Sequence, residues 1–303
     1  MKRALYFLLA MSAMSIGCGS SGRYGTPHDL AGTGNGDDGG NNNGSDGGSN
    51  QMGCEGELQG CYTVYAHSDS VLYLVDLMAK QLKTVGPFNA PMVNGKQDVI
   101  TDFAVAPDNS LWAISETNLY TVDANDGHVT LSTPVAACGT YAVALTFAPD
   151  GNLYAADYKG AFCHIDISSK PPRVTQLGMI GNNWAISGDI VSVGDGTMYG
   201  TAYDLADPSN TGTQINNFLI TVNPSSGGAI QRIGPTGYPK LFGVAYALGQ
   251  VFGFTHDGTG HVVTIDPKTG TGTLYNTFND PNTGKGISFA GAGVNAMVAP
   301  TIM

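Results

Sequence analysis

Two aspartates are the first candidates for chemistry in this 303-residue chain. Asp102 and Asp189 precede the apolar runs "FAVA" and "IVSV" at the same place in two copies of a repeated pattern. Equivalent positions of repeats that close into a ring meet near its axis. Carboxylates there can bind a divalent cation, with calcium as the candidate, or share a proton. The alternative is that both cap loop amides, because Asp is a common turn residue.

Histidines near the same ends of the repeats form a second set of possible metal ligands. His256, Asp257 and His261 occur within "HDGTGH", and the matching loop of the neighbouring repeat carries His67 and Asp69. Zinc binds imidazole and carboxylate groups whose donor atoms lie about 2 Å from the ion. One hypothesis is a metal held by the two aspartates with His256 and His261. The alternative is ordinary histidines on surface loops.

Trp184 in "GNNWAIS" is a candidate for stacking on a sugar ring, because an exposed indole offers an apolar face to such a ligand. Asn182 and Asn183 precede it, and their amides can hydrogen-bond hydroxyl groups. Tyr141 ends another loop and is a further candidate ligand-binding residue. The alternative for Trp184 is packing in the core, since aromatic residues usually bury area.

The elements that must position these residues are short β-strands. In "LTFAPDGNLYAADYKGAFCHID" two alternating apolar stretches flank Pro149-Asp150-Gly151, which is typical of a β-hairpin. Similar units follow Asp102, Asp189 and Gly243. Their spacing of about 42 to 54 residues is typical of four-stranded propeller blades.

The two ends of the repeat region supply one further blade. Residues 62–86 match only the second, third and fourth strands of the unit. Residues 286–300 provide the missing first strand, with Ser288 at the place that Asp102 occupies in its own repeat. Pairing the two ends removes exposed sheet edges. The sequence therefore predicts an all-β, five-bladed β-propeller closed by its terminal strands, with four or six blades as the alternatives.

Loop lengths distinguish the two faces of the predicted ring. Turns from first to second strands and from third to fourth strands are short and uniform, as in Gly194-Asp195-Gly196. The irregular loops lie at the opposite ends of the strands, and they include residues 87–101, 134–141, 179–188 and 204–217. Variable loops on a rigid scaffold commonly carry function, so we expect a ligand at this irregular face.

The first 18 residues have the features of an export signal. Lys2 and Arg3 precede "ALYFLLAMSAM", which is too short to span a bilayer, and "SIGC" ends at Cys18. The site resembles a bacterial lipobox, in which the cysteine is acylated before cleavage; Gly17 fits, whereas Ser15 departs from the usual leucine. The resemblance implies a lipid anchor on Cys18. The alternative is an ordinary signal peptide and a secreted protein.

Residues 19–53 have the composition of a tether. They are rich in Gly, Asn, Asp and Ser and have almost no apolar residues, so they cannot bury enough surface to fold. A calcium-binding loop is the alternative, but the closing glutamate of that motif is absent. We therefore expect a signal at 1–18, a disordered tether at 19–53 and a propeller at 54–303. The chain would be anchored to a bacterial membrane, facing the periplasm or the cell surface.

Four cysteines remain after Cys18, an even number that fits an oxidising compartment. Cys54 and Cys61 are close enough in sequence to pair at the entry to the propeller. Cys138 precedes a first strand, and Cys163 lies on the third strand of the same blade. Because these strands run in the same direction, both cysteines fall on one face. We predict two disulfides, Cys54–Cys61 and Cys138–Cys163, with free buried thiols as the alternative.

Several classes of function are disfavoured by what the sequence lacks. It has no Walker loop, no G-x-S-x-G elbow and no H-E-x-x-H pair. Its only glutamates are Glu55, Glu57 and Glu116, which are poorly placed for the general acid of a glycosidase. The formal net charge is −11 and no basic stripe occurs, which argues against nucleic-acid binding. We expect a monomer with no cofactor beyond a possible divalent cation.

The stretches "PDGNLYAAD" and "VVTIDPKTGTGTLY" resemble repeats of exported bacterial propellers in the gluconolactonase-like, NHL-like and quinoprotein-like group. The resemblance covers residues 62–300 and implies the fold. Lactonases of that group hold a metal with Glu, Asn and Asp, and no glutamate stands at the corresponding innermost-strand position here. The leading hypothesis is a lipid-anchored extracytoplasmic module that binds or scaffolds a protein or glycan through the irregular face. The alternative is a metal-dependent hydrolase or lactonase at the mouth of the central channel.

Overall fold

Each repeat of the sequence forms a four-stranded antiparallel sheet. The computed structural model describes residues 63–210 and 215–296. The turn at residues 148–152 shows how the repeated pattern works, because Gly151 has a φ of 85° and Asp150 accepts a 3.0 Å hydrogen bond from the amide two residues on. Glycine reaches this φ without steric cost, and the aspartate satisfies a free backbone donor.

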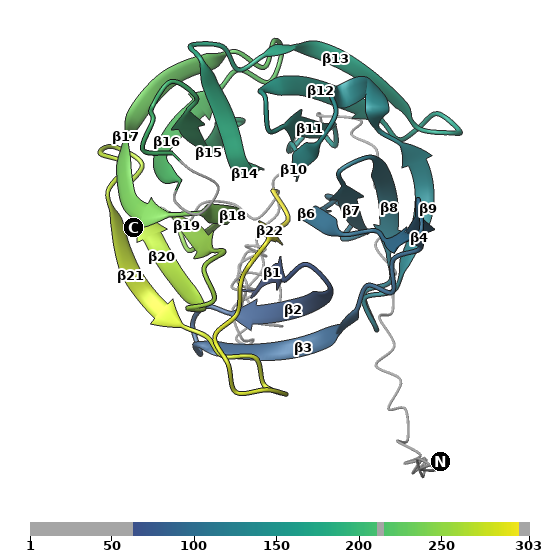
Figure 1. Cartoon of the computed structure of the whole chain (residues 1–303), viewed down its shortest axis with the longest axis horizontal. Coiled ribbons are helices and arrows are strands. Elements are labelled where there is room, and N and C mark those ends of the chain that lie inside the picture. The colour runs from purple at the N-terminus through teal and green to yellow at the C-terminus, as the bar shows by residue number, and fades with distance from the viewer. Residues whose placement is uncertain (1–62, 211–214, 297–303) are drawn as a thin grey trace, which may run out of the picture. The chain divides into compact units, whose positions relative to one another are not determined.

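Five such sheets are arranged in a ring as the blades of a β-propeller (Figure 1). In every blade the first strand lies next to the axis and the fourth strand lies at the circumference. Four blades are continuous in the chain. Their strands are β6 (Ile100–Val105), β7 (Leu111–Ser115), β8 (Asn118–Val122) and β9 (Val129–Pro134); β10 (Ala142–Phe147), β11 (Leu153–Asp157), β12 (Ala161–Asp166) and β13 (Arg173–Met179); β14 (Trp184–Ser192), β15 (Met198–Asp204), β16 (Asn216–Val222) and β17 (Ala229–Pro239); β18 (Leu241–Ala247), β19 (Gln250–Thr255), β20 (His261–Ile265) and β21 (Gly272–Thr277).

The fifth blade joins the two ends of the described chain. Its strands, from the axis outward, are β22 (Gly291–Gly293), β1 (Thr63–His67), β2 (Val71–Asp76) and β3 (Gln81–Pro87). Ala292 of β22 pairs antiparallel with Ala66 of β1. This pairing confirms the predicted five blades and their closure by the terminal strands.

The register of the fifth blade corrects one detail. His67 pairs with Gly291 as Ile114 pairs with Asp102, so Gly291 rather than Ser288 is equivalent to Asp102. Ser288 lies before β22. The alternation around Ser288 was a misleading strand signal, because its apolar neighbours are buried between blades instead.

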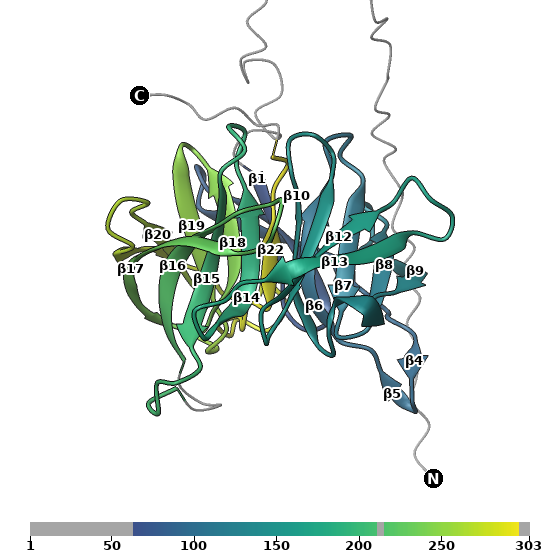
Figure 2. The ribbon, with the colours of Figure 1, turned by 90° about the horizontal axis from the view of Figure 1, so that it is seen from above.

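Two smaller elements interrupt the connections on the irregular face. β4 (Met92–Val93) and β5 (Lys96–Gln97) form a hairpin that projects from the ring (Figure 2). A short 3-10 helix covers Ala136–Cys138. In the described part of the chain, no helix is long and apolar enough to cross a membrane.

The outermost strand of every blade carries a bulge at an equivalent place. At this place the pairing with the third strand passes over one residue in each blade, and these residues are Val85, Ser132, Leu177, Ile233 and Tyr275. The pairing of β17 with β16 has two further shifts. A bulge leaves a residue unpaired and bends the strand. The solvent-facing edges of the blades are therefore interrupted.

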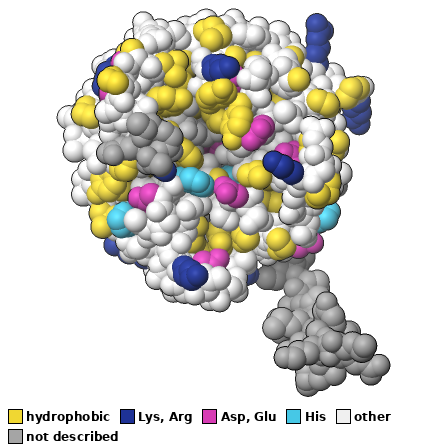
Figure 3. Space-filling model, in the orientation of Figure 1, with side chains coloured by type: hydrophobic (Ala, Val, Ile, Leu, Met, Phe, Trp, Pro, Cys, Tyr) yellow, Lys and Arg dark blue, Asp and Glu magenta, His cyan; other side chains and the backbone are white. Residues whose placement is uncertain are grey.

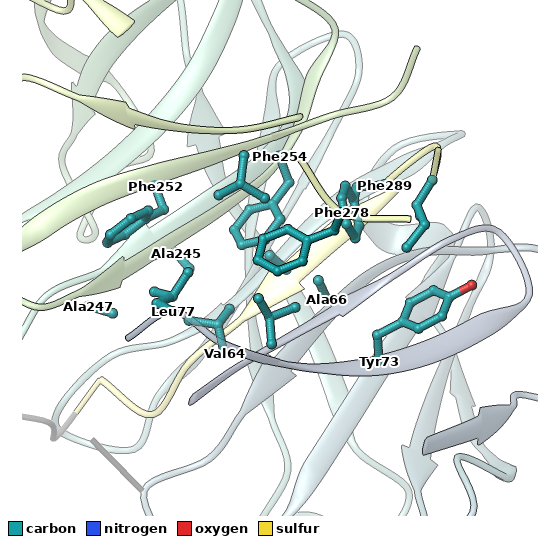
Figure 4. Packing of buried hydrophobic residues seen from close by; sticks show 14 residues of the cluster. Val64, Ala66, Tyr73, Leu77, Ala245, Ala247, Phe252, Phe254, Phe278 and Phe289 are labelled. Atoms are coloured by element: carbon teal, nitrogen blue, oxygen red, sulfur yellow. The ribbon is translucent and has the colours of Figure 1, made fainter. Parts of the chain in front are cut away.

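Apolar side chains fill the wedges between neighbouring sheets. Figure 4 shows one wedge, where Phe252 and Phe254 of β19 meet Phe289 and Val64 from the fifth blade. The rings of Phe254 and Phe289 lie edge to face with their centroids 5.3 Å apart. A fully buried phenylalanine side chain contributes roughly 1.5–3 kcal/mol. Such packing holds neighbouring blades together, because the main hydrogen-bond ladders lie within blades.

Cys138 and Cys163 form a disulfide, which confirms that predicted pair. Their Cα atoms are 5.6 Å apart, and the bond links the 3-10 helix to β12 of the same blade. It therefore fastens a loop of the irregular face to its blade. Cys18 and the predicted Cys54–Cys61 pair lie outside the described residues.

Replacing Gly291 with alanine should destabilise the ring. A methyl group there would overlap Asp102 Oδ1 and His67 Nε2, and overpacking of this kind typically costs about 1–3 kcal/mol. Urea unfolding should show this loss, whereas Gly228→Ala should change little because its nearest contact would be 3.6 Å away. Equal stability of the two variants would contradict the tight closure at β22.

Removing the disulfide should lower the free energy of unfolding by about 2–4 kcal/mol, because the unfolded chain gains freedom. The double variant Cys138→Ala/Cys163→Ala should unfold at lower urea concentration than the wild type. Dithiothreitol should lower the wild-type midpoint by more than that of the double variant, in which only the predicted Cys54–Cys61 pair could still be reduced. A wild-type midpoint that does not respond to reduction would argue against the bond.

Candidate functional site

A pocket of about 550 Å³ opens on the irregular face and is lined by residues of all five blades. Figure 3 shows this face, where histidine, acidic and hydrophobic side chains gather around a central hollow. Two rings of equivalent positions build the pocket, and a third closes it from below.

Bulges near the start of the innermost strands supply the wall of the pocket. The pairing of β6, β10 and β18 with their neighbours passes over one residue, and that of β14 passes over three. A bulge re-aims the side chain that leaves the ladder. The bulged residues that line the pocket are Thr101, Val143, Ser187, Gly188 and Phe242, and Ala290 takes the equivalent place before β22.

The irregular end of each second strand supplies the mouth of the pocket. The third strand of each blade ends in Val-Asp, Ile-Asp or Val-Asn, and the Val or Ile of this ending pairs with a residue of the second strand. The mouth residue of the blade stands five positions after that second-strand residue. In ring order these residues are Asp69, Glu116, Tyr158, Tyr203 and His256. All but the second line the pocket directly. The mouth therefore has two adjacent acids and two adjacent tyrosines.

Aromatic contacts organise the mouth. Tyr141 and Tyr158 lie edge to face with ring centroids 5.3 Å apart. In another blade, the rings of Phe242 and His256 are stacked with their centroids 4.8 Å apart. Burial is the main cause that raises the pKa of Tyr141 to about 12, and a hydrogen bond to Glu116 and the charge of Glu116 contribute to this rise. The acids and the tyrosines are thus in electrostatic contact.

Asp102 and Asp189 lie in the layer beneath the pocket, where the equivalent residues of the other blades are small: Ala144, Gly243 and Gly291. Both carboxyl groups are fully buried. Asp102 Oδ2 accepts a 2.5 Å hydrogen bond from the amide of Leu145, and Asp189 Oδ2 accepts one of 2.5 Å from Val244. Each aspartate therefore joins its innermost strand to that of the next blade.

Three further polar atoms of this layer have no hydrogen-bond partner elsewhere among the described residues. They are the Oδ1 atoms of Asp102 and Asp189 and the Nε2 atom of His67. The Nδ1–H group of His67 donates to the carbonyl of Ser68 at 2.8 Å, so Nε2 is an unprotonated acceptor. The two carboxyl groups interact with each other, and a hydrogen bond between carboxyl groups requires a proton on one of them.

Burial controls the ionisation of the layer. It raises the pKa of both aspartates well above the usual range, and the charge of Asp189 raises that of Asp102 further. Burial also lowers the pKa of His67 to about 4. The folded protein therefore favours a neutral imidazole and a retained proton on the carboxyl pair. The structure brings the two predicted aspartates together, but below the pocket and away from its surface.

The candidate metal ligands do not form a cluster in the structure. In residues 63–210 and 215–296, no three His, Cys, Asp or Glu side chains are placed to hold a metal ion. His256 lines the pocket, with Nδ1 at 3.2 Å from the carbonyl of Phe289. His261 begins β20, where its amide donates to Thr259 Oγ1 at 3.3 Å. A bound divalent cation remains a prediction.

The predicted sugar-stacking group is outside the pocket. Trp184 opens β14 and packs edge to face on Phe218, with ring centroids 5.3 Å apart. Asn182 and Asn183 are exposed and have φ values of 55° and 57°, which asparagine tolerates better than most residues. A turn and a packing contact explain this stretch, and its role in binding stays a prediction. Tyr141, by contrast, lines the pocket.

Three further residues that line the pocket, Tyr158, Tyr203 and Phe242, were not predicted from the sequence. A signal for the two tyrosines was present, because "YAADY" and "YGTAY" place a second tyrosine four residues after the first in adjacent repeats. Side chains of a strand alternate between the two faces of its sheet, so two tyrosines four residues apart lie on the same face. Nothing in the apolar pattern marks the bulge at Phe242.

The fold and the axial pocket define a five-bladed β-propeller with a ligand-sized cavity on its irregular face. No protein-family model matches the chain, and no curated protein matches it. One similar solved structure is a protein of unknown function from Bacteroides caccae, with 9% identity and a TM-score of 0.43. Another, from work on the de novo evolutionary emergence of a symmetrical protein, has 14% identity and a TM-score of 0.43. Each match covers 77% of this chain and 98% of the other.

The carboxyl pair should make the protein less stable as the pH rises. The folded pKa values are raised, so the folded state retains protons that the unfolded aspartates release above about pH 4. His67 acts oppositely between pH 6.5 and about 4, because its folded pKa is lowered and its stabilisation is lost as the pH falls. Above pH 6.5 only the carboxyl effect should remain, with a slope of up to about 1.4 kcal/mol per pH unit for each proton.

Urea unfolding from pH 4 to pH 9 measures this dependence. Asp102→Asn/Asp189→Asn should remove the fall above pH 6.5, because asparagine does not titrate. Asp195→Asn, on an exposed turn, is the matched control and should retain the wild-type profile. A wild-type profile that is flat above pH 6.5 would contradict the retained proton.

Proposed function

We propose that this protein is an exported binding module that recognises a polypeptide partner through its irregular face. The pocket on the axis carries the proposal, because it is large enough for a side chain or a small ligand and all five blades position its walls. A pocket built on bulges of paired strands is more rigid than one built on loops alone.

Exposed hydrophobic side chains on the irregular face support a polypeptide partner. Half of the large hydrophobic side chains that are exposed in the described chain lie on this face: Met92, Val99, Tyr141, Met179 and Leu205. Two of them, Val99 and Tyr141, also line the pocket. Exposed apolar groups around a cavity are typical of protein interaction sites, where a central anchor enters a pocket.

A second hollow extends the binding surface beside the β4–β5 hairpin. It has a volume of about 100 Å³ and shares Asp69 and Val99 with the central pocket. Its other lining residues include Phe88 and Gln97. A main pocket with an adjoining smaller one suits an extended chain that places two side chains.

A binding role is favoured over hydrolysis by the burial of Asp102 and Asp189. Neither carboxyl group reaches the pocket, and both accept backbone hydrogen bonds from a neighbouring blade. A glycan is the less favoured ligand, because Trp184 packs on Phe218 outside the pocket. Recognition without catalysis therefore accounts best for these residues.

Export and anchoring complete the proposal. The signal-like residues 1–18 and the lipobox-like Cys18 motivate a lipid anchor, with secretion as the alternative. The Cys138–Cys163 disulfide supports an oxidising compartment. The propeller would then present its irregular face to partners outside the cytoplasm.

Val99→Trp should block the pocket mouth and weaken partner binding. Peptides selected from a random display library on the wild-type protein should bind this variant at least about tenfold more weakly, a loss of about 1.4 kcal/mol. Leu274→Trp is the matched control, because Leu274 is similarly exposed but lies on the outermost strand β21. It should leave the affinity unchanged.

A glycan array probed with the wild type, Val99→Trp and Leu274→Trp tests whether the ligand is a sugar instead. Glycan binding that is lost in Val99→Trp, with no peptide recovered, would replace the polypeptide partner with a sugar. Peptides that bind Val99→Trp as well as wild type would place recognition away from this pocket.

A further inference from the structure

We infer that the axial pocket binds an ammonium group carried on an apolar stem. The inference rests on the proposed binding function and names the chemistry that the pocket recognises. The group has two possible sources, a lysine side chain of a polypeptide partner or a free organic ammonium compound.

The charge around the pocket favours a cation. Asp69 lines the pocket, and Glu116 is its neighbour in the ring of mouth residues and contacts Tyr141. Among the described residues that line the pocket there is no lysine or arginine. The whole chain has a formal net charge of −11, which steers cations toward it. An anionic ligand would meet repulsion from Asp69 in the pocket wall.

The aromatic wall favours the same ligand. The rings of Tyr141, Tyr158 and Tyr203 all line the pocket, the first two from one blade and the third from the next. Aromatic faces attract ammonium groups through the ring quadrupole, and the attraction grows when the cation is desolvated. Lys159 Nζ lies 5.3 Å from the centre of the Tyr158 ring, so this ring already has a cation of the molecule on it, and the ligand is left to the rings of Tyr141 and Tyr203.

A buried hydroxyl group points to a ligand with hydrogen-bond donors. Ser187 lines the pocket and is 7% exposed, and within residues 63–210 and 215–296 its Oγ atom has no hydrogen-bond partner. Its lone pairs can accept an N–H group of a primary ammonium or the O–H group of an ammonium alcohol such as choline, and either would satisfy an otherwise costly buried atom. The remaining wall includes Val143, Ile186 and Ile215, which suit an apolar stem.

Calorimetric titration with a matched pair of probes tests the inference. Choline and 3,3-dimethylbutan-1-ol have the same shape and differ in the charged nitrogen, so their affinity ratio measures recognition of the cation. Choline should bind roughly tenfold more tightly or better. Tyr203→Leu and Asp69→Asn should each reduce the ratio several-fold, whereas Tyr203→Phe should preserve it because the aromatic ring remains. Equal affinities for the two probes would overturn the inference, as would a ratio that neither Tyr203→Leu nor Asp69→Asn changes.

Peptides from the display selection distinguish the two sources and separate this inference from the proposed function. If a lysine of a selected peptide supplies the ammonium group, replacing it with norleucine should weaken binding at least about tenfold. Choline binding without any recovered peptide would retain the ammonium site and assign it to a free compound, and the polypeptide function would then fail. Peptides that lose affinity in Val99→Trp but tolerate norleucine, together with no choline preference, would overturn the ammonium inference and leave polypeptide binding intact.

Discussion

The pairing of β22 with β1 is the constraint on which the rest of the molecule depends. It is short, since β22 spans only Gly291–Gly293, yet it brings together strands from the two ends of the described chain. Without it, one blade would lose its axial strand and the wedge beside β19 would open to water. The pocket would also lose one side, because Ala290 belongs to its wall. The pairing of β22 with β1 thus determines both the stability of the ring and the geometry of the pocket. The small size of Gly291, which lies in this pairing, is therefore important for both.

The pocket shows how a repeated backbone produces an asymmetric site. Every blade contributes a wall position and a mouth position at matching places, so the backbone alone is nearly symmetrical. Side-chain identity breaks the symmetry: Asp69 and Glu116 are neighbours on one side, and Tyr158 and Tyr203 are neighbours on another. The buried layer below is also uneven, because only two of its five equivalent positions carry carboxyl groups. A ligand would therefore meet acidic groups on one side of the pocket and tyrosine rings on another, although the backbone around it is nearly symmetrical.

The sequence was informative where its patterns are local and repeated. The spacing of apolar runs and Asp-Gly turns predicted the five blades, and strand direction predicted the Cys138–Cys163 bond. The position of β22 could not be predicted in the same way, because Gly-Ala-Gly has no alternation whereas the stretch around Ser288 has it. The pocket was also hidden, since bulges shift a residue such as Phe242 out of register without changing the apolar pattern. Asp102 was expected at the channel mouth, but the bulge before it turns Thr101 toward the pocket and leaves the carboxyl group beneath.

The bulges of the outermost strands have a consequence for how whole molecules meet. A flat strand at the circumference would offer a continuous row of amides and carbonyls to a second copy, and such rows seed intermolecular sheets. Here all five peripheral strands are kinked at matching points, so two molecules cannot align long unpaired runs side by side. Each repeat adds one exposed strand edge and also one bulge that interrupts this edge. Concentrated solutions of the protein should therefore resist aggregation by edge-to-edge pairing of strands.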